Sequence, residues 1–227
     1  MIRLEDVTFG WPGAAPLFSG LSLALPSGAG IAVTGPNGAG KSTLLRLIAG
    51  LERPQKGRIA LGPEAHDPAM PGTFARHGGA VLQASDRHYV SRTVLQEVAL
   101  GPKLLGLPDP EGLAHAALDR LGLAAHGPAH PLDLHAGARR LVSLAAAIAH
   151  RPRILLLDEV QRGLDRLHRA RVVDLIATEA AAGATILIVS HDVEFLAATC
   201  RLRLVIDPGA AGRRVRLAEE GGGPDRR

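Results

Sequence analysis

The first quarter of the chain alternates apolar with polar or small residues at two positions, 2–9 and 21–25. A period of two predicts strands that turn one face to a core. Three later segments, 31–34, 154–157 and 185–190, are apolar almost throughout. Uninterrupted apolar strands are typical of a sheet buried on both faces. We therefore expect an α/β fold with a mostly parallel central sheet and an antiparallel β part at the N-terminal end.

The remaining pattern places helices around this sheet. Two further strands are predicted at 79–82 and 202–206, and helices at 43–49, 139–149 and about 165–181. From 91 to about 135 the pattern becomes helical and is broken by glycine and proline, which indicates an inserted helical subdomain at about 91–137. Residues from about 208 to 227 are expected to form a loop-rich tail. The whole chain, 1–227, is predicted to be one domain.

Composition agrees with a globular protein whose core is built from small aliphatic residues. The chain is 46% hydrophobic, 21% charged and only 3% aromatic. No apolar run approaches the roughly 18 residues of a membrane span, no secretion signal follows Met1, and there is one cysteine. These features predict a cytoplasmic protein. The net charge of +4 comes from scattered arginines, several of them in a C-terminal segment expected to be frayed, so no direct nucleic-acid partner is expected.

A glycine-rich loop carries the strongest chemical signal. The sequence GPNGAGKS at positions 35–42 matches GxxxxGK[ST], follows a buried strand and opens a helix. Glycines let backbone N–H groups close around phosphate oxygens, and the helix N-terminus adds partial positive charge. The residues expected to cradle phosphates are Gly35, Pro36, Asn37, Gly38, Ala39, Gly40, Lys41, Ser42 and Thr43. Lys41 would neutralise phosphate charge, and the Ser42 hydroxyl would ligate Mg²⁺.

Two adjacent acids end the buried strand at 154–157. Ligands of open parallel sheets bind beyond the carboxyl ends of the strands, so Asp158 is expected to face the Mg²⁺ ion. Glu159 would point toward an attacking water. Together, loop and acids predict an ATP- and Mg²⁺-dependent site.

With these motifs the chain resembles an ATP-binding-cassette (ABC) ATPase, a P-loop NTPase, over almost its whole length. Four further positions match that family's motifs in order. Trp11 lies where the family has an aromatic that stacks on adenine, and Gln83 lies where it has the Q-loop glutamine. Gly163-Leu164-Asp165 matches the D-loop, and His191 matches the switch histidine. The resemblance implies that Gln83 joins Ser42 and Asp158 at Mg²⁺. It also implies that His191 places the water that Glu159 polarises.

The segment LHAGARR at 134–140 is similar to the family signature LSGGQ followed by basic residues. In that family the signature of one protomer closes over the nucleotide of a second one, which implies that His135 and Gly137 act in trans and that Asp165 lies at the dimer seam. His135, Ala136 and Ala138 depart from the pattern, as does the Val160-Gln161 pair that replaces Pro-Thr. We therefore expect slow hydrolysis by a homodimer, or a heterodimer in which another ATPase supplies a competent site.

The segment after Gln83 contains T-V-x-x-E-V-A-x-G-P, which resembles the ATPases of energy-coupling factor (ECF) importers and their cobalt and nickel relatives. This implies a peripheral protein at the cytoplasmic face of the membrane, docked to a membrane T-component through a groove near Gln83 and residues 93–105. A separate membrane protein would capture a vitamin, such as biotin, or a cobalt or nickel ion. In the alternative interpretation, the apolar Val94 and Val98 of a helix at 93–100 simply pack the helical subdomain.

Other interpretations remain to be compared. The chain could be the cassette of another transporter type, or a soluble nucleotide-sensing cassette with little turnover, which the altered signature favours and Glu159 and His191 disfavour. A DNA-repair or translation cassette would need a coiled-coil insertion, an added arm or a second cassette, and the sequence contains none. His126, His130 and His135 are spaced like metal ligands, but two prolines interrupt them and only Asp133 accompanies them, so they are assigned to an ordinary loop.

Overall fold

Two sheets form the framework of the protein. The computed structural model describes residues 1–62, 64–66, 72–83, 89–209 and 212–219. A four-stranded antiparallel sheet has the order β2-β1-β4-β5, and a six-stranded sheet has the order β10-β9-β3-β8-β7-β6. The strands of the first are β1 (Ile2–Phe9), β2 (Phe18–Leu25), β4 (Lys56–Leu61) and β5 (Glu64–His66). Those of the second are β3 (Ala29–Thr34), β6 (Gly78–Val81), β7 (Ile154–Asp158), β8 (Thr185–Val189), β9 (Leu202–Gly209) and β10 (Gly212–Glu219).

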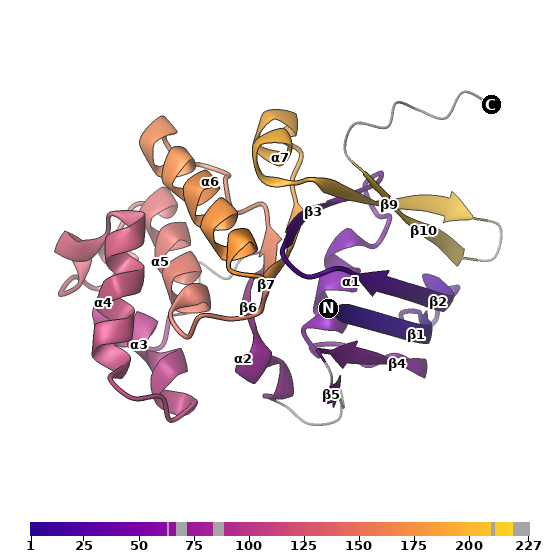
Figure 1. The fold of residues 1–227 in the computed structure, drawn as a ribbon, viewed down its shortest axis with the longest axis horizontal. Helices are drawn as coiled ribbons and strands as arrows, with labels where there is room; N and C mark the ends of the chain where they lie inside the picture. The colour runs from indigo at the N-terminus through magenta and orange to yellow at the C-terminus, as the bar shows by residue number, and fades with distance from the viewer. Residues whose placement is uncertain (63, 67–71, 84–88, 210–211, 220–227) are drawn as a thin grey trace.

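Helices cover both faces of the larger sheet. They are α1 (Lys41–Ile48), α2 (Thr73–His77), α3 (Val94–Leu104), α4 (Pro110–Leu121), α5 (Ala136–Ile148), α6 (Arg166–Ala181) and α7 (Val193–Thr199), with short 3₁₀ turns at Ala124–His126 and Pro131–Asp133. Figure 1 shows α3, α4 and α5 gathered at one end of the molecule and the antiparallel sheet at the other. None of the helices in the described ranges is long and apolar enough to cross a bilayer.

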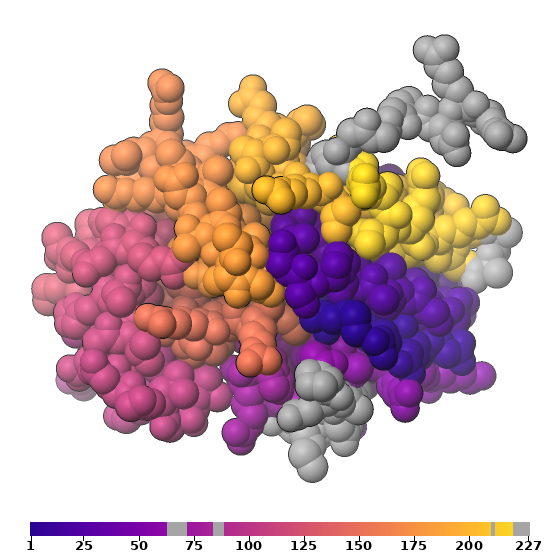
Figure 2. Space-filling view, viewed as in Figure 1, coloured from indigo at the N-terminus to yellow at the C-terminus, as the bar shows by residue number. Residues whose placement is uncertain are grey.

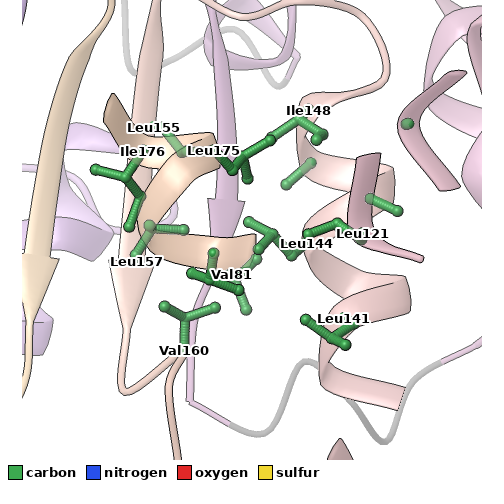
Figure 3. Close-up of a cluster of buried hydrophobic side chains, with 14 of the residues drawn as sticks. Val81, Leu121, Leu141, Leu144, Ile148, Leu155, Leu157, Val160, Leu175 and Ile176 are labelled. Carbon is green, nitrogen blue, oxygen red and sulfur yellow. The ribbon is translucent and has the colours of Figure 1, made fainter. Parts of the chain in front are cut away.

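The apolar strands are buried on both faces, as the sequence predicts. In β7, Leu155 and Leu157 belong to one hydrophobic cluster, and Ile154 and Leu156 to another on the opposite face. The first cluster runs from the sheet to α4 and α5, and Val81, Leu121, Leu141, Leu144 and Val160 belong to it (Figure 3). The second lies between the sheet, α1 and the antiparallel strands. The mostly parallel sheet and the antiparallel N-terminal part are confirmed.

The expected loop-rich tail is wrong for most of the described part of that segment. Strand β9 continues to Gly209, and β10 pairs antiparallel with it from Gly212 to Glu219. Arg213, Arg214 and Arg216 therefore lie on a strand rather than on a frayed end, whereas Arg226 and Arg227 lie outside the described residues. Only two alternate residues of this strand, Val215 and Leu217, pack against the core, and the arginines beside them hide this short apolar period. Charged side chains are common on edge strands. Figure 2 shows the hairpin (yellow) against the N-terminal strands (indigo).

Several short elements have no clear signal in the sequence. Strands β4 and β5 and helices α2 and α7 were not expected, and α5 begins at Ala136, three residues before the predicted start. The segment predicted to be helical between 91 and 137 forms α3, α4 and the beginning of α5. Each of the short elements spans eight residues or fewer, which is too few for a periodic pattern to be recognised.

Candidate functional site

The phosphate loop lies between the end of β3 and the start of α1, at the carboxyl edge of the six-stranded sheet. Gly35, Gly38 and Gly40 have positive φ angles of 149°, 74° and 101°. A side chain on Gly35 would collide with the carbonyl oxygen of Ile206. Gly40 is the residue before α1, so the free N–H groups of that helix open onto the loop. These glycines produce a cup lined by backbone donors.

Lys41 bends back over this cup. Its Nζ donates to the carbonyl oxygens of Gly35, at 2.8 Å, and Pro36, at 3.0 Å, and the residue is only 9% exposed. The ammonium group is therefore held at the mouth of the loop by neutral acceptors. Anionic phosphate oxygens are stronger partners for an ammonium than peptide carbonyls.

Ser42 and Asp158 provide a pair of oxygen ligands beside the cup. Ser42 Oγ donates to Asp158 Oδ2 at 2.7 Å. Burial raises the pKa of Asp158, and the Ser42 hydrogen bond acts in the opposite direction. A hydroxyl and a carboxylate fit Mg²⁺, which usually binds one or two protein oxygens and completes its shell with water and phosphate. The described residues contain no cluster of three or more His, Cys, Asp or Glu that would suit another metal.

Glu159 adopts a left-handed backbone conformation, with φ of 55°, directly after β7. Its N–H donates to Val189 O at 2.9 Å, and the next residue, Val160, is fully buried. Oε1 accepts the backbone N–H of His191 at 3.0 Å, and Oε2 accepts Gln161 Nε2 at 3.0 Å. Strained non-glycine backbone of this kind is concentrated at functional sites.

Most of these groups line one open cleft of about 1100 Å³, which we call the central cleft. Gly35 and Pro36 are absent from its lining. Of the residues predicted from the sequence, it brings together Trp11, Asn37, Gly38, Ala39, Gly40, Lys41, Ser42, Thr43, Gln83, Asp158, Glu159 and His191. Trp11 is 44% exposed and packs edge-on against Phe9, with ring centroids 5.3 Å apart. One side of the indole is thus free to contact a ligand in the cleft.

The signature segment lies beside the central cleft and does not line it. His135 precedes α5, where its Nδ1 accepts the N–H of Ala138 at 3.2 Å. Gly137 lies so close to the D-loop that a Cβ there would be 2.7 Å from Gly163 O. Asp165 caps α6 by accepting the backbone N–H of His168, and hydrogen bonds from His168 lower the pKa of Asp165. His135, Gly137 and Asp165 are therefore absent from the lining of the cleft.

Side chains without a role predicted from the sequence hold the edge of the cleft in place. Arg169 on α6 forms a double hydrogen bond with Asp192, at 2.5 and 2.9 Å, next to His191. Gln161 connects Glu159 with Ser190. No motif marks Arg169, and Gln161 was noted only as a departure from the family pattern.

The expected docking segment is partly outside the described residues, since 84–88 are not described. Thr93 caps α3, and Val94 and Val98 are fully buried in the helical core. These two side chains thus pack the helical part, as the alternative interpretation held, and are not available to a docked helix. Val90 and Leu104, each 78% exposed, are the large apolar side chains that the segment presents on its surface.

Comparisons with known proteins give one consistent result. The profile of the ABC transporter family matches residues 18–162. The cobalt import ATP-binding protein CbiO of Rhodobacter capsulatus is 40% identical over 87% of this chain and 72% of its own length. The energy-coupling factor transporter ATP-binding protein EcfA of Methanothermobacter thermautotrophicus is 32% identical over 92% and 68%. The structure of cbiO1 from Clostridium perfringens, part of the cbiONQ transporter complex, is 26% identical with a TM-score of 0.77, over 90% of this chain and 83% of that one.

Proposed function

The chain belongs to the ABC transporter family of ATP-binding proteins, and we propose that it powers the import of a transition-metal ion or a vitamin through separate membrane proteins. ATP hydrolysis coupled to transport is the activity of this family. The observation that carries the proposal is the hydrogen bond between Ser42 and Asp158 inside the cleft that also holds Lys41 and Glu159. It supports the proposal because the residues proposed for phosphate, metal and water, Lys41, Ser42, Asp158 and Glu159, line one cleft.

In this proposal Trp11 stacks on adenine and residues 35–43 surround the phosphates. Lys41 leaves the carbonyl oxygens of Gly35 and Pro36 and bonds the β- and γ-phosphates, a change that replaces neutral acceptors with charged ones. Ser42, Gln83 and Asp158 would hold Mg²⁺. The bound ion would supply charge neutralisation for the transferred phosphoryl group.

The chemical step is assigned to Glu159 and His191. Glu159 polarises a water and takes its proton while the water oxygen bonds the γ-phosphorus and the bond to ADP breaks. The His191 ring lies near the same carboxylate, with its Nε2 at 3.9 Å from Glu159 Oε1. From this position its ring can hold the same water toward the γ-phosphate.

A second ABC protomer, identical or different, would complete the site. His135 and Gly137 do not line their own cleft, so contact with nucleotide requires another copy. Because His135 Nδ1 accepts the Ala138 N–H, the proton of the neutral ring lies on Nε2. Nε2 is then the donor offered to a γ-phosphate in trans. Asp165 lies next to this segment, at the proposed dimer seam.

Coupling to the membrane is assigned to the region near Gln83 and residues 93–105. Gln83 lines the cleft, and exposed Val90 and Leu104 lie at the two ends of the segment that leads into and along α3. A helix of a membrane T-component placed here would sense nucleotide through Gln83. We propose that residues 91–137 act as the helical subdomain and that the protein binds peripherally at the cytoplasmic face. The likeness to a cobalt import ATP-binding protein favours a metal ion as cargo.

The test is the pair Glu159→Gln and Glu5→Gln. Glu5 pairs with Arg58 on the outer side of β1 and lies away from the cleft, so its variant serves as the control. Glu159→Gln should bind Mg·ATP, lose turnover by about 100-fold or more, and elute as a stable dimer in the presence of ATP. Undiminished turnover would contradict the assignment. Copurification from detergent extracts, with metal analysis of the complex, tests the transport proposal separately.

A nucleotide-sensing cassette is the second candidate, favoured by the His135 and Ala136 substitutions in the signature. Single-turnover hydrolysis with Mg²⁺ and membrane partners distinguishes the two. A protein that binds ATP but never cleaves it is a sensor, and one that cleaves it is a transport motor.

A further inference from the structure

We propose that Gln161 is a positioning residue for ATP hydrolysis: its amide orients the Glu159 carboxylate and ties it to the loop that carries His191. The inference rests on the roles proposed above for Glu159 and His191. It concerns a residue that stands, with Val160, where Pro-Thr commonly follows the acid pair.

The Gln161 amide uses both of its N–H groups at once. Nε2 donates to Glu159 Oε2 at 3.0 Å and to Ser190 Oγ at 2.6 Å. The orientation of the amide follows from these partners, since the reverse orientation would place its carbonyl oxygen against a carboxylate oxygen. Gln161 therefore acts as a double donor between β7 and the end of β8.

The carboxylate is held from both sides. Its second oxygen, Oε1, accepts the backbone N–H of His191 at 3.0 Å. Ser190 Oγ also accepts the N–H of Asp192 at 2.9 Å. Three hydrogen bonds and the peptide bond between Ser190 and His191 thus join Glu159, Gln161, Ser190 and His191 in a closed ring, and Glu159 cannot turn without disturbing the chain next to His191.

Packing alone does not explain this side chain. Gln161 is 8% exposed, and its Oε1 is buried without a hydrogen-bond partner in the described part of the chain. A buried unpaired acceptor costs free energy that an apolar side chain of similar length would avoid. The amide is therefore best explained by its two N–H bonds, which bind a reacting group and the adjacent loop.

Orientation of this kind affects the rate more than the binding of substrate. A water must meet the carboxylate and the γ-phosphate in one geometry, and small displacements of a reacting group cost up to about 100-fold in rate. The groups around the phosphates and the indole of Trp11 do not contact Gln161 through any of these bonds. Loss of the amide should therefore lower kcat and leave KM for ATP nearly unchanged.

The test is Gln161→Leu in the full chain, assayed with any partner that turnover requires. We expect kcat to fall about 10- to 100-fold, with KM and the affinity for a non-hydrolysable ATP analogue within about twofold of the parent. In a Glu159→Gln background the same substitution should cause no further loss, because it acts through Glu159. Thr178→Val is the control: it removes one side-chain hydrogen bond, to Asp174 O on α6, away from the central cleft.

An unchanged kcat in Gln161→Leu, or a loss that multiplies with that of Glu159→Gln, would overturn the inference. If Gln161→Leu does not fold, Ser190→Ala is the test variant, because it breaks the ring and keeps the Gln161–Glu159 hydrogen bond. It should lower kcat several-fold and leave KM unchanged. A normal kcat in Ser190→Ala would contradict the role of the ring. Glu159→Gln separates this inference from the proposed function. Full turnover in that variant rejects the role that the proposed function gives to Glu159, whereas an inactive Glu159→Gln beside a fully active Gln161→Leu rejects only the positioning role of Gln161.

Discussion

Ser42 Oγ donates to Asp158 Oδ2 at 2.7 Å, across 116 positions of sequence. The two side chains proposed to ligate Mg²⁺ are thus joined by a hydrogen bond. Both come from rigid elements, the first turn of α1 and the end of β7. Under the proposed function, Mg²⁺ would therefore replace a hydrogen bond between two groups that rigid elements already hold side by side.

Asp158→Asn should remove Mg²⁺-dependent ATP binding and hydrolysis without lowering the melting temperature at neutral pH. Burial raises the pKa of the Asp158 carboxyl, which means that its charged form is disfavoured in the folded protein. Removing the charge therefore costs no stability in the absence of the metal. Calorimetric titration with ATP, with and without Mg²⁺, together with thermal melts of the free protein checks both parts. A clearly less stable Asn variant would contradict the second.

Asp192→Asn should destabilise the protein at neutral pH by about 1 kcal/mol, the upper range for a partly exposed ion pair. The pKa of Asp192 is lowered, first by the Phe195 N–H and then by Arg169. A group whose pKa is lowered on folding stabilises the fold while it is charged. This stabilisation is lost as the pH falls through the folded-state pKa, which lies below the ordinary value of about 3.9. The difference between variant and parent should therefore disappear in strong acid. Denaturant titrations at several pH values measure it, and a gap that persists at low pH would exclude the ionic origin.

Gly137→Ala should destabilise the start of α5. The added methyl group would lie 2.7 Å from Gly163 O, a backbone atom that cannot rotate away. Overpacking of this type costs about 1–3 kcal/mol. The control is Gly101→Ala in α3, where the nearest heavy atom is 4.0 Å away and a helical alanine should stabilise by up to about 1 kcal/mol. Equal effects of the two substitutions on the melting temperature would show that the contact with Gly163 is unimportant.

His135→Ser combined with Ala136→Gly should raise steady-state ATP hydrolysis about tenfold or more, since one well-placed donor to developing charge is worth about 10²–10³ in rate. Serine is a preferred residue before a helix, so α5 should keep its start. His135→Ala, which lacks both the donor and the cap, should lower activity instead. An activity equal to that of the parent in the double variant would show that these positions do not limit the rate.

Much of the candidate site can be predicted from short stretches of sequence. The phosphate loop, Asp158 and Glu159 are predicted from contiguous residues, namely the glycines at 35, 38 and 40 and an apolar strand that ends at one acid and is followed by a second. The apolar runs of β7 and β8 likewise predict a sheet buried on both faces, and the structure confirms it.

What the sequence left open are relationships between distant residues. The ring through Gln161 and Ser190, the Arg169–Asp192 pair, the burial of Val94 and the pairing of β10 with β9 all depend on which surfaces meet when the chain packs. A local pattern reports propensity and the period of burial, and it contains no information on the partner across the fold. The sequence by itself therefore determined the phosphate-loop motif and the acid pair, whereas only the tertiary structure decided what holds Glu159, because that choice is made by groups that follow two separate strands and meet only in the folded chain.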